Sequence, residues 1–392
     1  MTRLVCLEPA DPGAAWQPFT GARPIAELRA GAWLIRERWA GMLGLDQAVV
    51  MGDHAPRFTD AGSAPVVPAG PVTGPAIVAR SDFAPAGPPP DLEGSVRRLV
   101  HDGRTVAWIV AEGDTWKAED DAGRALPVEG LQLRGAWDLI TALEHFLPGD
   151  CTDAMADGPE PVPDGSIVLG DPAEVACFGA LVEPGVVFDV RQGPVILEAG
   201  VQVLSGTRLE GPLFVGPESV LMGGVIRQSA IGPKCRVHGE IGACIFMGYA
   251  NKSHDGFVGH SVIGQWVNLG AGTITSNLKN TYGEVRLDLP GGRIETGRMN
   301  LGTLFGDHVK TAIGTLLSTG TVIGTGANVL GPHPARWIAP FTWGSEVDTG
   351  ERTRLDCEGF LKVARRVLPR RRIEVTEELE ASLRAIHARL AR

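Results

Sequence analysis

The sequence predicts a mixed α/β domain followed by a parallel β-helix of hexapeptide repeats, with short helices after it. The main observation is a strict spacing of six between the aliphatic residues Leu197, Val203, Leu209, Val215 and Leu221. A second observation is a change in pattern along the chain. Up to about residue 150, short apolar segments alternate with stretches of helical spacing, and from residue 167 the helical spacing disappears.

Residues 1–150 are expected to form the α/β domain. The segments "AVVMG", "PAIVAR" and "VAWIVA" are bounded by Gly and Pro, and they predict short strands. Helical spacing in "PIAELRAGAWLIRERWAGML" predicts a helix over 24–43, and "GAWDLITALEHFL" predicts a second helix over 135–147. Residues 151–166 are rich in Pro, Gly and Asp, which predicts a linker.

Residues 167–345 are expected to form the β-helix. An aliphatic residue followed by glycine recurs there, as in Val215-Gly216 and Ile263-Gly264. Each hexad supplies one short strand whose aliphatic side chain points inward. Three hexads close one triangular coil, which stacks on the next at the spacing of paired strands.

Two segments fall outside the repeat. The rhythm breaks at about 279–300, where "LKNTYGEVRLDLPGGRIETGRMN" predicts an inserted hairpin with "PGG" at its tip. Residues 346–392 predict short amphipathic helices, and a repeat protein needs such helices to cap its open end.

Composition argues against several classes of protein. A net charge of −10 disfavours a nucleic-acid partner, because binding phosphates needs a basic surface. No apolar run approaches the roughly 18 residues of a membrane span, and the N-terminal segment lacks the pattern of a signal peptide, so we expect a cytoplasmic protein. None of the cysteines forms a C-x-x-C pair, so we expect buried free thiols at Cys6, Cys151, Cys177, Cys235, Cys244 and Cys357.

The segment "HDGFVGHSVIGQWVNLGAGTITSNL", residues 254–278, resembles the acetyltransferase half of the bifunctional bacterial N-acetylglucosamine-1-phosphate uridyltransferase/glucosamine-1-phosphate acetyltransferases. That family carries H-x-x-Y-x-G, then I-G, then V-N-I-G-A-G-T-I-T-x-N-Y, and the spacing here matches without a gap. "WQPFTGARPIAELRAG" is similar to the opening of sugar nucleotidyltransferases. The resemblance implies a shorter branch of the family, with a reduced nucleotidyltransferase-like α/β domain and a left-handed parallel β-helix that forms a homotrimer.

The resemblance also implies an acyl-transfer site. His254 takes the general-base position. Asn268 and Asn277 match substrate-binding positions, and Ala271, preceded by Gly270, matches the position whose backbone meets the acetyl group of acetyl-CoA. The implied reaction moves acetyl from acetyl-CoA to an amino-sugar phosphate. Asparagine is also favoured at the turns of such coils, and a single histidine on a turn is commonly structural, so this second interpretation stays open.

Three family positions differ in this chain. The expected tyrosines are Phe257 and Leu278, and the lysine that grips the sugar phosphate aligns with Gly242. Loss of this clamp weakens phosphate binding unless another cation replaces it. The candidates for replacement are Lys252, Arg236 and Lys234.

A second polar segment, "FGDHVKTAIGT", adds His308 and Lys310. In a trimer His308 could lie across an interface from His254 and contribute to substrate binding, and an exposed loop histidine is the alternative. A different class of function is also open. Some hexapeptide-repeat proteins, the gamma-class carbonic anhydrases, bind zinc through three histidines shared across the trimer interface, and His254, His260 and His308 could form such a set.

For the N-terminal domain, the resemblance suggests nucleotidyl transfer to a sugar 1-phosphate. Arg23 and Arg29 could hold a sugar phosphate, and Asp82 follows a strand where the family has its Mg²⁺-binding aspartate. The stretch "LEPADPGAAWQPFT" stands where the family has a glycine-rich phosphate loop, and its acidic and proline residues suit phosphate poorly. The preferred function is an acyltransferase of sugar-nucleotide biosynthesis. The alternative is a non-catalytic scaffold or regulatory subunit that binds a nucleotide sugar.

Overall fold

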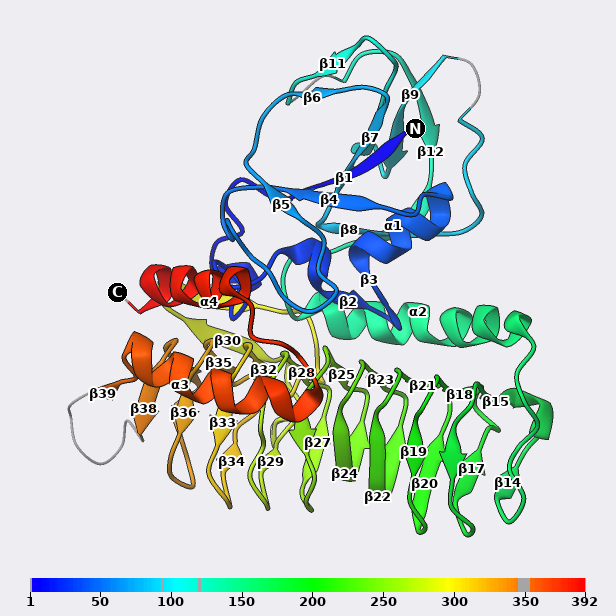
Figure 1. The fold of residues 1–392 in the computed structure, drawn as a ribbon, viewed down its shortest axis with the longest axis vertical. Coiled ribbons are helices and arrows are strands. Elements are labelled where there is room, and N and C mark those ends of the chain that lie inside the picture. Colours follow the sequence, from blue (N-terminus) through cyan, green and yellow to red (C-terminus); the bar gives the residue numbers. More distant parts are fainter. Residues whose placement is uncertain (1, 93–94, 119–120, 345–352, 392) are drawn as a thin grey trace.

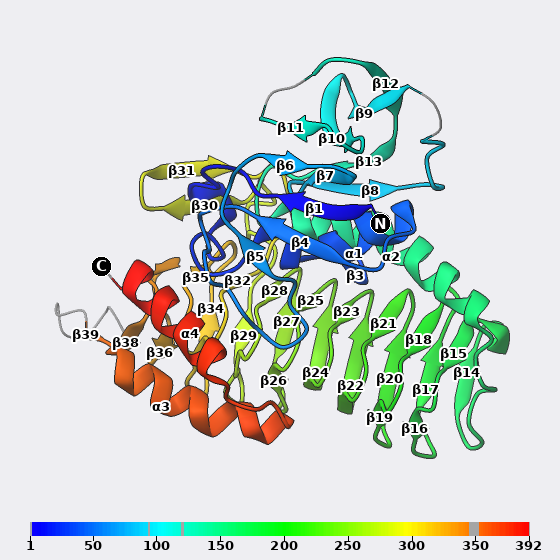
Figure 2. The ribbon, with the colours of Figure 1, turned by 45° about the horizontal axis from the view of Figure 1, so that its top comes forward.

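The computed structural model describes residues 2–92, 95–118, 121–344 and 353–391. The sheet of the N-terminal domain lies on one side of a β-solenoid, and helix α2 (Asp138–Ala154) lies between them (Figures 1 and 2). The expected fold class is confirmed in an α/β sheet, a parallel β-solenoid and C-terminal helices. In the described part of the chain, no helix is long and apolar enough to cross a membrane. The expected boundary at 345–346 lies outside the described residues.

Seven strands form the N-terminal sheet, in the order β12-β9-β10-β7-β1-β4-β5. The strand bounds are β1 Arg3–Leu7, β4 Ala48–Met51, β5 Val66–Val67, β7 Ala76–Arg80, β9 Val96–His101, β10 Arg104–Val110 and β12 Arg124–Pro127. The three strands expected from apolar segments are β4, β7 and β10. The chain runs from β1 outward to β4 and β5 and then returns to β7 on the other side of β1, always in parallel. The strand order therefore reverses between β1 and β7.

Smaller elements complete this domain. They are η1 (Ala14–Trp16), the ladder of β6 (Val72–Thr73) with β11 (Thr115–Trp116), and the ladder of β8 (Phe83–Ala86) with β13 (Glu129–Gln132).

The helix expected over 24–43 forms only in its second half, as α1 (Ile35–Leu43). Before it lie the 3-10 turn η2 (Ile25–Glu27) and a tight hairpin of β2 (Arg29–Ala30) with β3 (Trp33–Leu34). This hairpin turns at Gly31, whose φ of 76° is in the left-handed region that favours glycine. A carboxylate oxygen of Asp150 in α2 accepts a hydrogen bond from the N–H of Ala32 at 2.8 Å. A contact with a distant helix therefore stabilises the turn in place of a longer α1.

Helix α2 is longer than expected, because it continues beyond residue 147 and through Pro148. The 3-10 turn η3 (Met155–Asp157) follows it, so the first half of the expected 151–166 linker is helical. Cys151 and Ala154 are buried. Burial of this last stretch offsets the backbone hydrogen bond that Pro148 cannot donate.

One side of the solenoid is a nine-stranded parallel sheet, which we call the covered face. Its strands are β15 (Val175–Cys177), β18 (Val195–Leu197), β21 (Leu213–Val215), β23 (Ala230–Ile231), β25 (Ile245–Phe246), β28 (Val262–Ile263), β32 (Leu304–Phe305), β35 (Val322–Ile323) and β37 (Trp337–Ile338). Val195 pairs with Leu213, one coil of three hexads later. Val262 pairs with Leu304 across a longer interval, because the expected hairpin of β30 (Arg286–Leu289) with β31 (Gly292–Glu295) is inserted there.

The other two sides carry shorter strands, and β22 and β24 each bend from one side to the other. The first face holds β14 (Ile167–Leu169), β17 (Val187–Asp189), β20 (Thr207–Glu210), the later parts of β22 (Val220–Arg227) and β24 (Arg236–Gly242), β27 (Phe257–Gly259), β29 (Ile274–Thr275) and β34 (Leu316–Leu317). The third face holds β16 (Leu181–Val182), β19 (Gln202–Val203), the start of β22 and of β24, β26 (Asn251–Lys252), β33 (Lys310–Thr311), β36 (Asn328–Val329) and β38 (Thr342–Gly344), which β39 (Thr353–Arg354) joins. The 3-10 turn η4 (Pro172–Glu174) precedes β15.

Three corners join these faces, and each coil passes from the first face to the covered face and then to the third face. His260 lies at the corner between the first and covered faces. Trp266 and His308 lie at the corner between the covered and third faces, and all three of these residues have a left-handed φ between 46° and 62°. His254 lies at the corner between the third and first faces, followed by Gly256. We call these the His260, Trp266 and His254 corners.

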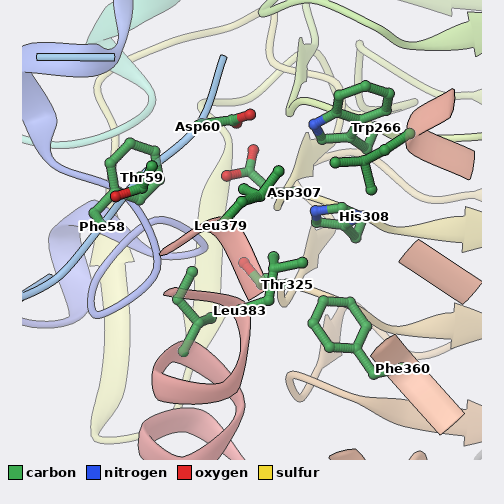
Figure 3. Close-up of a pocket in the computed structure, with 12 residues that line it drawn as sticks. Phe58, Thr59, Asp60, Trp266, Asp307, His308, Thr325, Phe360, Leu379 and Leu383 are labelled. Atoms are coloured by element: carbon green, nitrogen blue, oxygen red, sulfur yellow. The ribbon is translucent and has the colours of Figure 1, made fainter. Parts of the chain in front are cut away.

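The C-terminal helices form as expected, as α3 (Cys357–Val367), η5 (Leu368–Arg371) and α4 (Glu377–Leu390). Their expected position as an end cap is wrong, because they lie along the Trp266 corner (Figure 1). Phe360 of α3 and Leu383 of α4 face Trp266 and His308 across this corner (Figure 3). The corner carries large aromatic side chains, and the two helices shield them from water.

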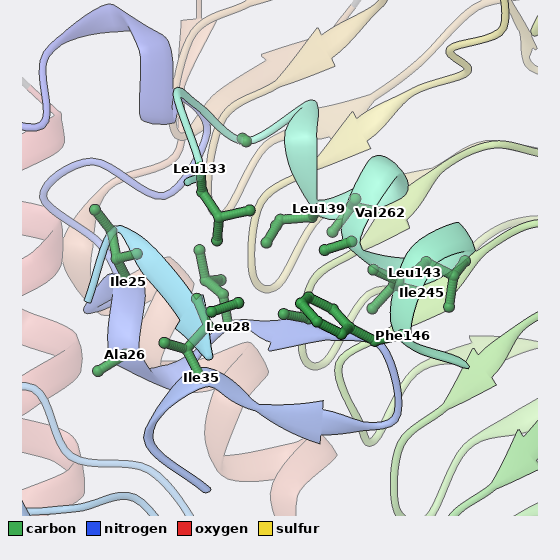
Figure 4. Close-up of a cluster of buried hydrophobic side chains, with 14 of the residues drawn as sticks. Ile25, Ala26, Leu28, Ile35, Leu133, Leu139, Leu143, Phe146, Ile245 and Val262 are labelled. Carbon is green, nitrogen blue, oxygen red and sulfur yellow. The ribbon is translucent and has the colours of Figure 1, made fainter. Parts of the chain in front are cut away.

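The inner core of the solenoid follows the repeat, and all five aliphatic residues of the six-residue series are fully buried. The covered face is apolar on its outer side as well. Ile245 and Val262 point outward there and pack against Leu139, Leu143 and Phe146 of α2 (Figure 4). The same cluster continues into the N-terminal domain, so one hydrophobic core joins the two parts of the chain.

Candidate functional site

The His254 corner is exposed and rigidly stacked. His254 and Asp255 are exposed, and the backbone oxygen of Asp255 accepts a hydrogen bond from the N–H of Gly272 in the next coil at 3.0 Å. The oxygen of Ala271 accepts from the N–H of Gly314 one coil further at 2.8 Å. The predicted general base and the predicted acetyl-binding segment, Gly270 and Ala271, therefore lie on adjacent coils at one corner.

Lys252 lies inside the solenoid, where its neighbours in register are aliphatic. Its Nζ donates hydrogen bonds to the backbone oxygens of His254 and Asp255, the second at 3.0 Å. Burial lowers the pKa of Lys252 to about 8, although the charge of Asp255 opposes this shift. Since the side chain is fully buried, it fixes the backbone of the His254 corner and is not open to a substrate phosphate.

Asn277 lies on the first face, close to Phe257 and beside the His260 corner. Its Nδ2 is 2.7 Å from Nδ1 of His260. Burial lowers the pKa of His260 below its ordinary value, and the charge of Glu144 opposes this shift. A Cβ at Gly259 would lie 2.5 Å from the ring of Phe257 and 2.9 Å from Nδ2 of Asn277. Phe257 and Asn277 therefore border the backbone at Gly259, next to the His260 corner.

The third face brings together Arg236, Asn268 and Lys310. The sequence predicts a substrate-binding role for Arg236 and Asn268 but not for Lys310. Arg236 is in register with Asn251, which pairs with Asn268, and Asn268 pairs with Lys310. The Nδ2 of Asn251 donates to Oδ1 of Asn268 at 2.9 Å. These residues line a cavity of about 290 Å³, and we call it the third-face cavity.

His308 does not reach any site at His254. It is buried at the Trp266 corner, where its ring stacks on Trp266 with centroids 6.2 Å apart and meets Phe360 edge-on at 5.3 Å (Figure 3). Burial, with the charges of Lys310 and Arg23, holds the pKa of His308 well below its ordinary value. The adjoining cavity, about 10 Å³, is too small for a substrate. The expected contact of His308 with substrate is therefore wrong for this chain.

The zinc alternative finds no support in this geometry. His254, His260 and His308 lie at three different corners, and two of them are engaged by Asn277 and by aromatic rings. Among the described residues, no group of three or more His, Cys, Asp or Glu side chains could hold a metal ion. All six cysteines are free, as expected, and five are buried, whereas Cys357 is only half-buried. Burial raises the pKa of Cys235 and Cys244 to about 12 each.

Arg23 and Arg29 are not open to a sugar phosphate. The guanidinium of Arg23 is buried between Asp60, at 2.9 Å, and Asp307, at 2.8 Å. Arg29 is buried and donates to the backbone oxygen of Ala32 in the β2–β3 hairpin. Arg23 joins the N-terminal domain to Asp307 of the solenoid, whereas Arg29 lies in the β2–β3 hairpin, so the structure does not join them into a phosphate site.

Asp82 does not fit a Mg²⁺ site. Its Oδ1 accepts from Nε of Arg80 at 3.0 Å, and its Oδ2 accepts from Arg104 at 2.8 Å. Burial raises the pKa of Asp82, but the hydrogen bonds and charges of the two arginines outweigh it, so the pKa lies below its usual value. Both carboxylate oxygens are already satisfied by cations, so Asp82 positions Arg80 and Arg104 instead.

Arg80 and Arg104 line a cavity of about 880 Å³ in the described part of the N-terminal domain. The carboxyl ends of β1, β4 and β7 border it at Leu7, Met51 and Arg80. Open sheets bind ligands at the carboxyl ends of parallel strands where the strand order reverses, and here it reverses between β1 and β7. This position makes the cavity the candidate binding site of the domain.

One carboxylate that lines this cavity accepts hydrogen bonds from two backbone N–H groups. Glu8, which follows β1, accepts from the N–H groups of Ile25 at 2.7 Å and Ala26 at 3.0 Å, and its Oε2 is 2.7 Å from Nε2 of His54. Backbone N–H groups in such a place otherwise bind phosphate. Because the carboxylate of Glu8 occupies them, the N–H groups of Ile25 and Ala26 at the start of η2 are not available to a phosphate.

Several residues that line the 880 Å³ cavity and the third-face cavity were not predicted from the sequence. Arg80 and Arg104 lie at strand ends, which is the signal that could have identified them. Arg370 and Arg371 line the third-face cavity from η5. Their basic run, "RRVLPRRR", is visible in the sequence, but it reads only as part of a helix until the helix is placed on the solenoid.

Comparison with known proteins agrees with this organisation, although no protein-family model matches the chain. The chain is 35% identical over 146 residues to the bifunctional sugar-1-phosphate nucleotidylyltransferase/acetyltransferase of Sulfurisphaera tokodaii, covering 35% of each protein. It is 34% identical over 116 residues to the bifunctional protein GlmU of Methanocaldococcus jannaschii, covering 29% of the chain and 26% of that protein. It is 28% identical over 215 residues to the protein of the same name from Methanococcus aeolicus, covering 52% of the chain and 46% of that protein. The matches thus span less than half the length of each relative.

Proposed function

Because the chain is a distant homologue of bifunctional sugar-1-phosphate nucleotidyltransferase/acetyltransferases, we propose that it transfers acetyl from acetyl-CoA to the amine of an amino-sugar phosphate. A homologue with acetyltransferase activity implies an acyl-CoA donor. The wider proposal is a role in the biosynthesis of nucleotide sugars of the UDP-N-acetylglucosamine type, which supply the cell envelope.

The observation that carries this proposal is the arrangement of the His254 corner. An exposed imidazole stands on a backbone that Lys252 holds from inside, and the adjacent coil presents the small residues Gly270 and Ala271. Small residues allow a thioester to approach the backbone closely. A general base and an open backbone surface at one corner are what acyl transfer to an amine requires.

In the proposed reaction the acceptor amine attacks the carbonyl carbon of the thioester. His254 takes one proton from the amine nitrogen as the new C–N bond forms. The tetrahedral intermediate then collapses, the C–S bond breaks, and CoA leaves as a thiolate that accepts a proton from the imidazolium. The products are the N-acetylated sugar phosphate and free CoA thiol, with His254 neutral again.

The oligomer implied by the sequence resemblance, a homotrimer, is part of the proposal. Ile274, Ile313, Leu316 and Leu330 are exposed at 37% to 79% on neighbouring coils around the His254 corner and the first face. Ile274 and Leu316 are in register on adjacent strands, so their side chains form one continuous apolar strip. Apolar strips of this kind mark contacts between proteins. A trimer contact here would enclose His254.

For the N-terminal domain we propose binding of a nucleotide sugar without nucleotidyl transfer. The 880 Å³ cavity offers Arg80 and Arg104 for a diphosphate and Trp108 and Trp116 for a base. The carboxylate of Glu8 occupies the N–H groups of Ile25 and Ala26, and both oxygens of Asp82 accept hydrogen bonds from arginines, so these groups are not available to a phosphate or to Mg²⁺. This observation favours the alternative of a binding or regulatory role for this half of the chain.

The decisive experiment measures release of CoA thiol from acetyl-CoA with a panel of amino-sugar 1-phosphates and UDP-amino sugars. Wild type is compared with His254→Ala and with His238→Ala, a half-buried histidine one coil away whose Nε2 lies 2.8 Å from Asp255. We expect turnover with one acceptor class, loss of at least a hundredfold in His254→Ala and retention of most activity in His238→Ala. No turnover with any acceptor, or equal turnover in His254→Ala, would remove the acyl-transfer proposal.

The N-terminal proposal is tested separately by calorimetric titration with UDP-N-acetylglucosamine. Arg104→Gln should weaken binding about tenfold, because a charge-assisted contact to the diphosphate is lost. Arg124→Gln, on the same sheet but outside the cavity, should not. If wild type shows no binding, or if turnover of UTP and a sugar 1-phosphate is found, the binding-only role is wrong.

A further inference from the structure

The third-face cavity gathers four cationic side chains from three separate parts of the chain. Arg236 comes from β24, Lys310 from β33, and Arg370 and Arg371 from η5. Two cross-contacts hold η5 on the coil. Nε of Arg371 donates to the backbone oxygen of Lys234 at 3.0 Å, and Nζ of Lys234 donates to the backbone oxygen of Arg371 at 3.4 Å. The cluster is therefore built into the fold.

No carboxylate balances these charges within the cavity. None of its described lining residues is Asp or Glu. Glu218 does not line the cavity, and it forms ion pairs with Lys234 at 3.4 Å and with Arg372 at 3.9 Å. Like charges brought together without a counter-ion repel one another, so the arrangement lowers stability unless an anion is bound.

Two of the cationic side chains have lowered pKa values. The amine of Lys310 donates to the backbone oxygen of His308 at 3.0 Å, and burial lowers its pKa to about 8. Burial, followed by the charges of Arg236 and Arg370, lowers the pKa of Arg371 below its ordinary value. A bound anion would raise the pKa of both groups, because an opposite charge favours their protonated forms.

We propose that the third-face cavity binds the phosphate group of an organic phosphate. Guanidinium groups pair with phosphate through two parallel hydrogen bonds, and three arginines with a lysine match a group that carries two negative charges and three oxygens. The amides of Asn251 and Asn268 lie on the floor of the cavity and supply further polar contacts. A volume of about 290 Å³ holds a phosphate and part of the molecule attached to it.

The cavity lies within reach of the His254 corner. Asn251 precedes His254 by three residues on the same coil, so their Cα atoms are at most about 11 Å apart. A phosphate bound on the third face can therefore belong to a molecule whose reacting group lies at the corner. Under the proposed acyl transfer, on which only this assignment rests, the phosphate belongs either to the amino-sugar acceptor or to the CoA donor.

Calorimetric titration of the full chain tests this site with three probes, namely inorganic phosphate, glucosamine 1-phosphate and CoA. The test variant is the double substitution Arg236→Gln with Arg370→Gln, both of which are exposed side chains. The matched control is Arg366→Gln, an exposed arginine at the end of α3 that does not line the cavity. We expect the double variant to lose at least tenfold in affinity for one of the organic phosphates, and the control to stay within twofold of wild type.

A selective loss for glucosamine 1-phosphate assigns the cavity to the acceptor, and a selective loss for CoA assigns it to the donor. Equal affinities of the double variant and the control for all three probes, or the absence of binding of all three to wild type, would overturn the proposal. His254→Ala should keep the binding while losing turnover. Binding that persists without any turnover would therefore separate this site from the fate of the acyl-transfer proposal.

Discussion

Nε of Arg23 lies 2.8 Å from Oδ2 of Asp307, and this contact joins residues 284 positions apart in the chain. The same guanidinium lies 2.9 Å from Asp60 and 4.8 Å from the centre of the Phe58 ring. The other oxygen of Asp307 accepts the N–H of Gln265 at 2.8 Å. One buried arginine thus links the N-terminal domain to two coils of the solenoid.

Removal of Arg23 should be strongly destabilising. Arg23→Met leaves the two buried carboxylates of Asp60 and Asp307 without a cation, which costs about 3–5 kcal/mol in comparable sites. The measurement is the free energy of unfolding in urea. The control is Arg293→Gln, which breaks an exposed pair with Asp288 and should cost less than about 1 kcal/mol. Equal losses in the two variants would show that the buried pair does not hold the domains together.

A methyl group at Gly256 should disturb the His254 corner. Its φ is 129°, and an added Cβ would lie 2.3 Å from the backbone oxygen of Thr273 in the next coil. Because neither backbone can yield easily, we expect Gly256→Ala to cost about 3 kcal/mol or more and to lower turnover. Gly314 occupies the same corner with open space around it, so Gly314→Ala should cost only about 1–2 kcal/mol of left-handed strain. Thermal unfolding of both variants decides the matter, and a similar shift in both would refute the steric explanation.

The stability of the protein should depend on pH through Lys252. The pKa of this amine is about 8 in the folded chain and near 10.5 when exposed, so between these values the unfolded chain binds more protons. The contribution of Lys252 to stability therefore rises with pH between about 8 and 10.5, and below pH 8 its cost is constant. Lys252→Met removes this term. We expect the stability of wild type relative to the variant to increase from pH 7.5 to 10 in urea titrations, and a constant difference would contradict the lowered pKa.

His308 should make stability depend on pH in the same direction, but in the acid range. The pKa of His308 in the folded chain lies well below 6.5. As the pH falls through 6.5, the unfolded chain therefore binds a proton that the folded chain does not bind, and the folded state loses stability. His308→Phe keeps an aromatic ring against Trp266 and Phe360. The variant should lose less stability than wild type between pH 7 and 5. Parallel curves for the two proteins would mean that His308 titrates in the folded state.

The repeat was the most predictable part of the structure, because its information is local. Each inward aliphatic residue is fixed by its own position in a hexad, so Val203 and Val215 are buried where the period places them. The same period separates His254 from His260 by six residues, which already sets them at different corners. The position of His308 could not be counted in this way, because the inserted hairpin interrupts the period before it.

Features that depend on distant contacts were not predictable. The pattern over 24–43 satisfies helical spacing, but Asp150, 118 residues from Ala32, stabilises a turn at Gly31 instead. The helix α2 extends past Pro148 because the solenoid buries its last turn. The third-face cavity forms only where η5 lies beside β24, and no local sequence pattern predicts that contact. The candidate residues Arg236 and Asn268 were thus identified from sequence, whereas their partners Arg370 and Arg371 were not.

The packing of α4 has a consequence for how the chain is made. Arg389 donates hydrogen bonds to the backbone oxygens of Gly21 and Pro56, more than 300 residues earlier in the chain, and Ser382 binds the N–H of Thr59 at 3.0 Å. During synthesis the N-terminal domain leaves the ribosome first, with its apolar underside facing water until the coils and α4 follow. The contacts of Gly21, Pro56 and Thr59 with α4 therefore form only after residues 382–389 have been synthesised.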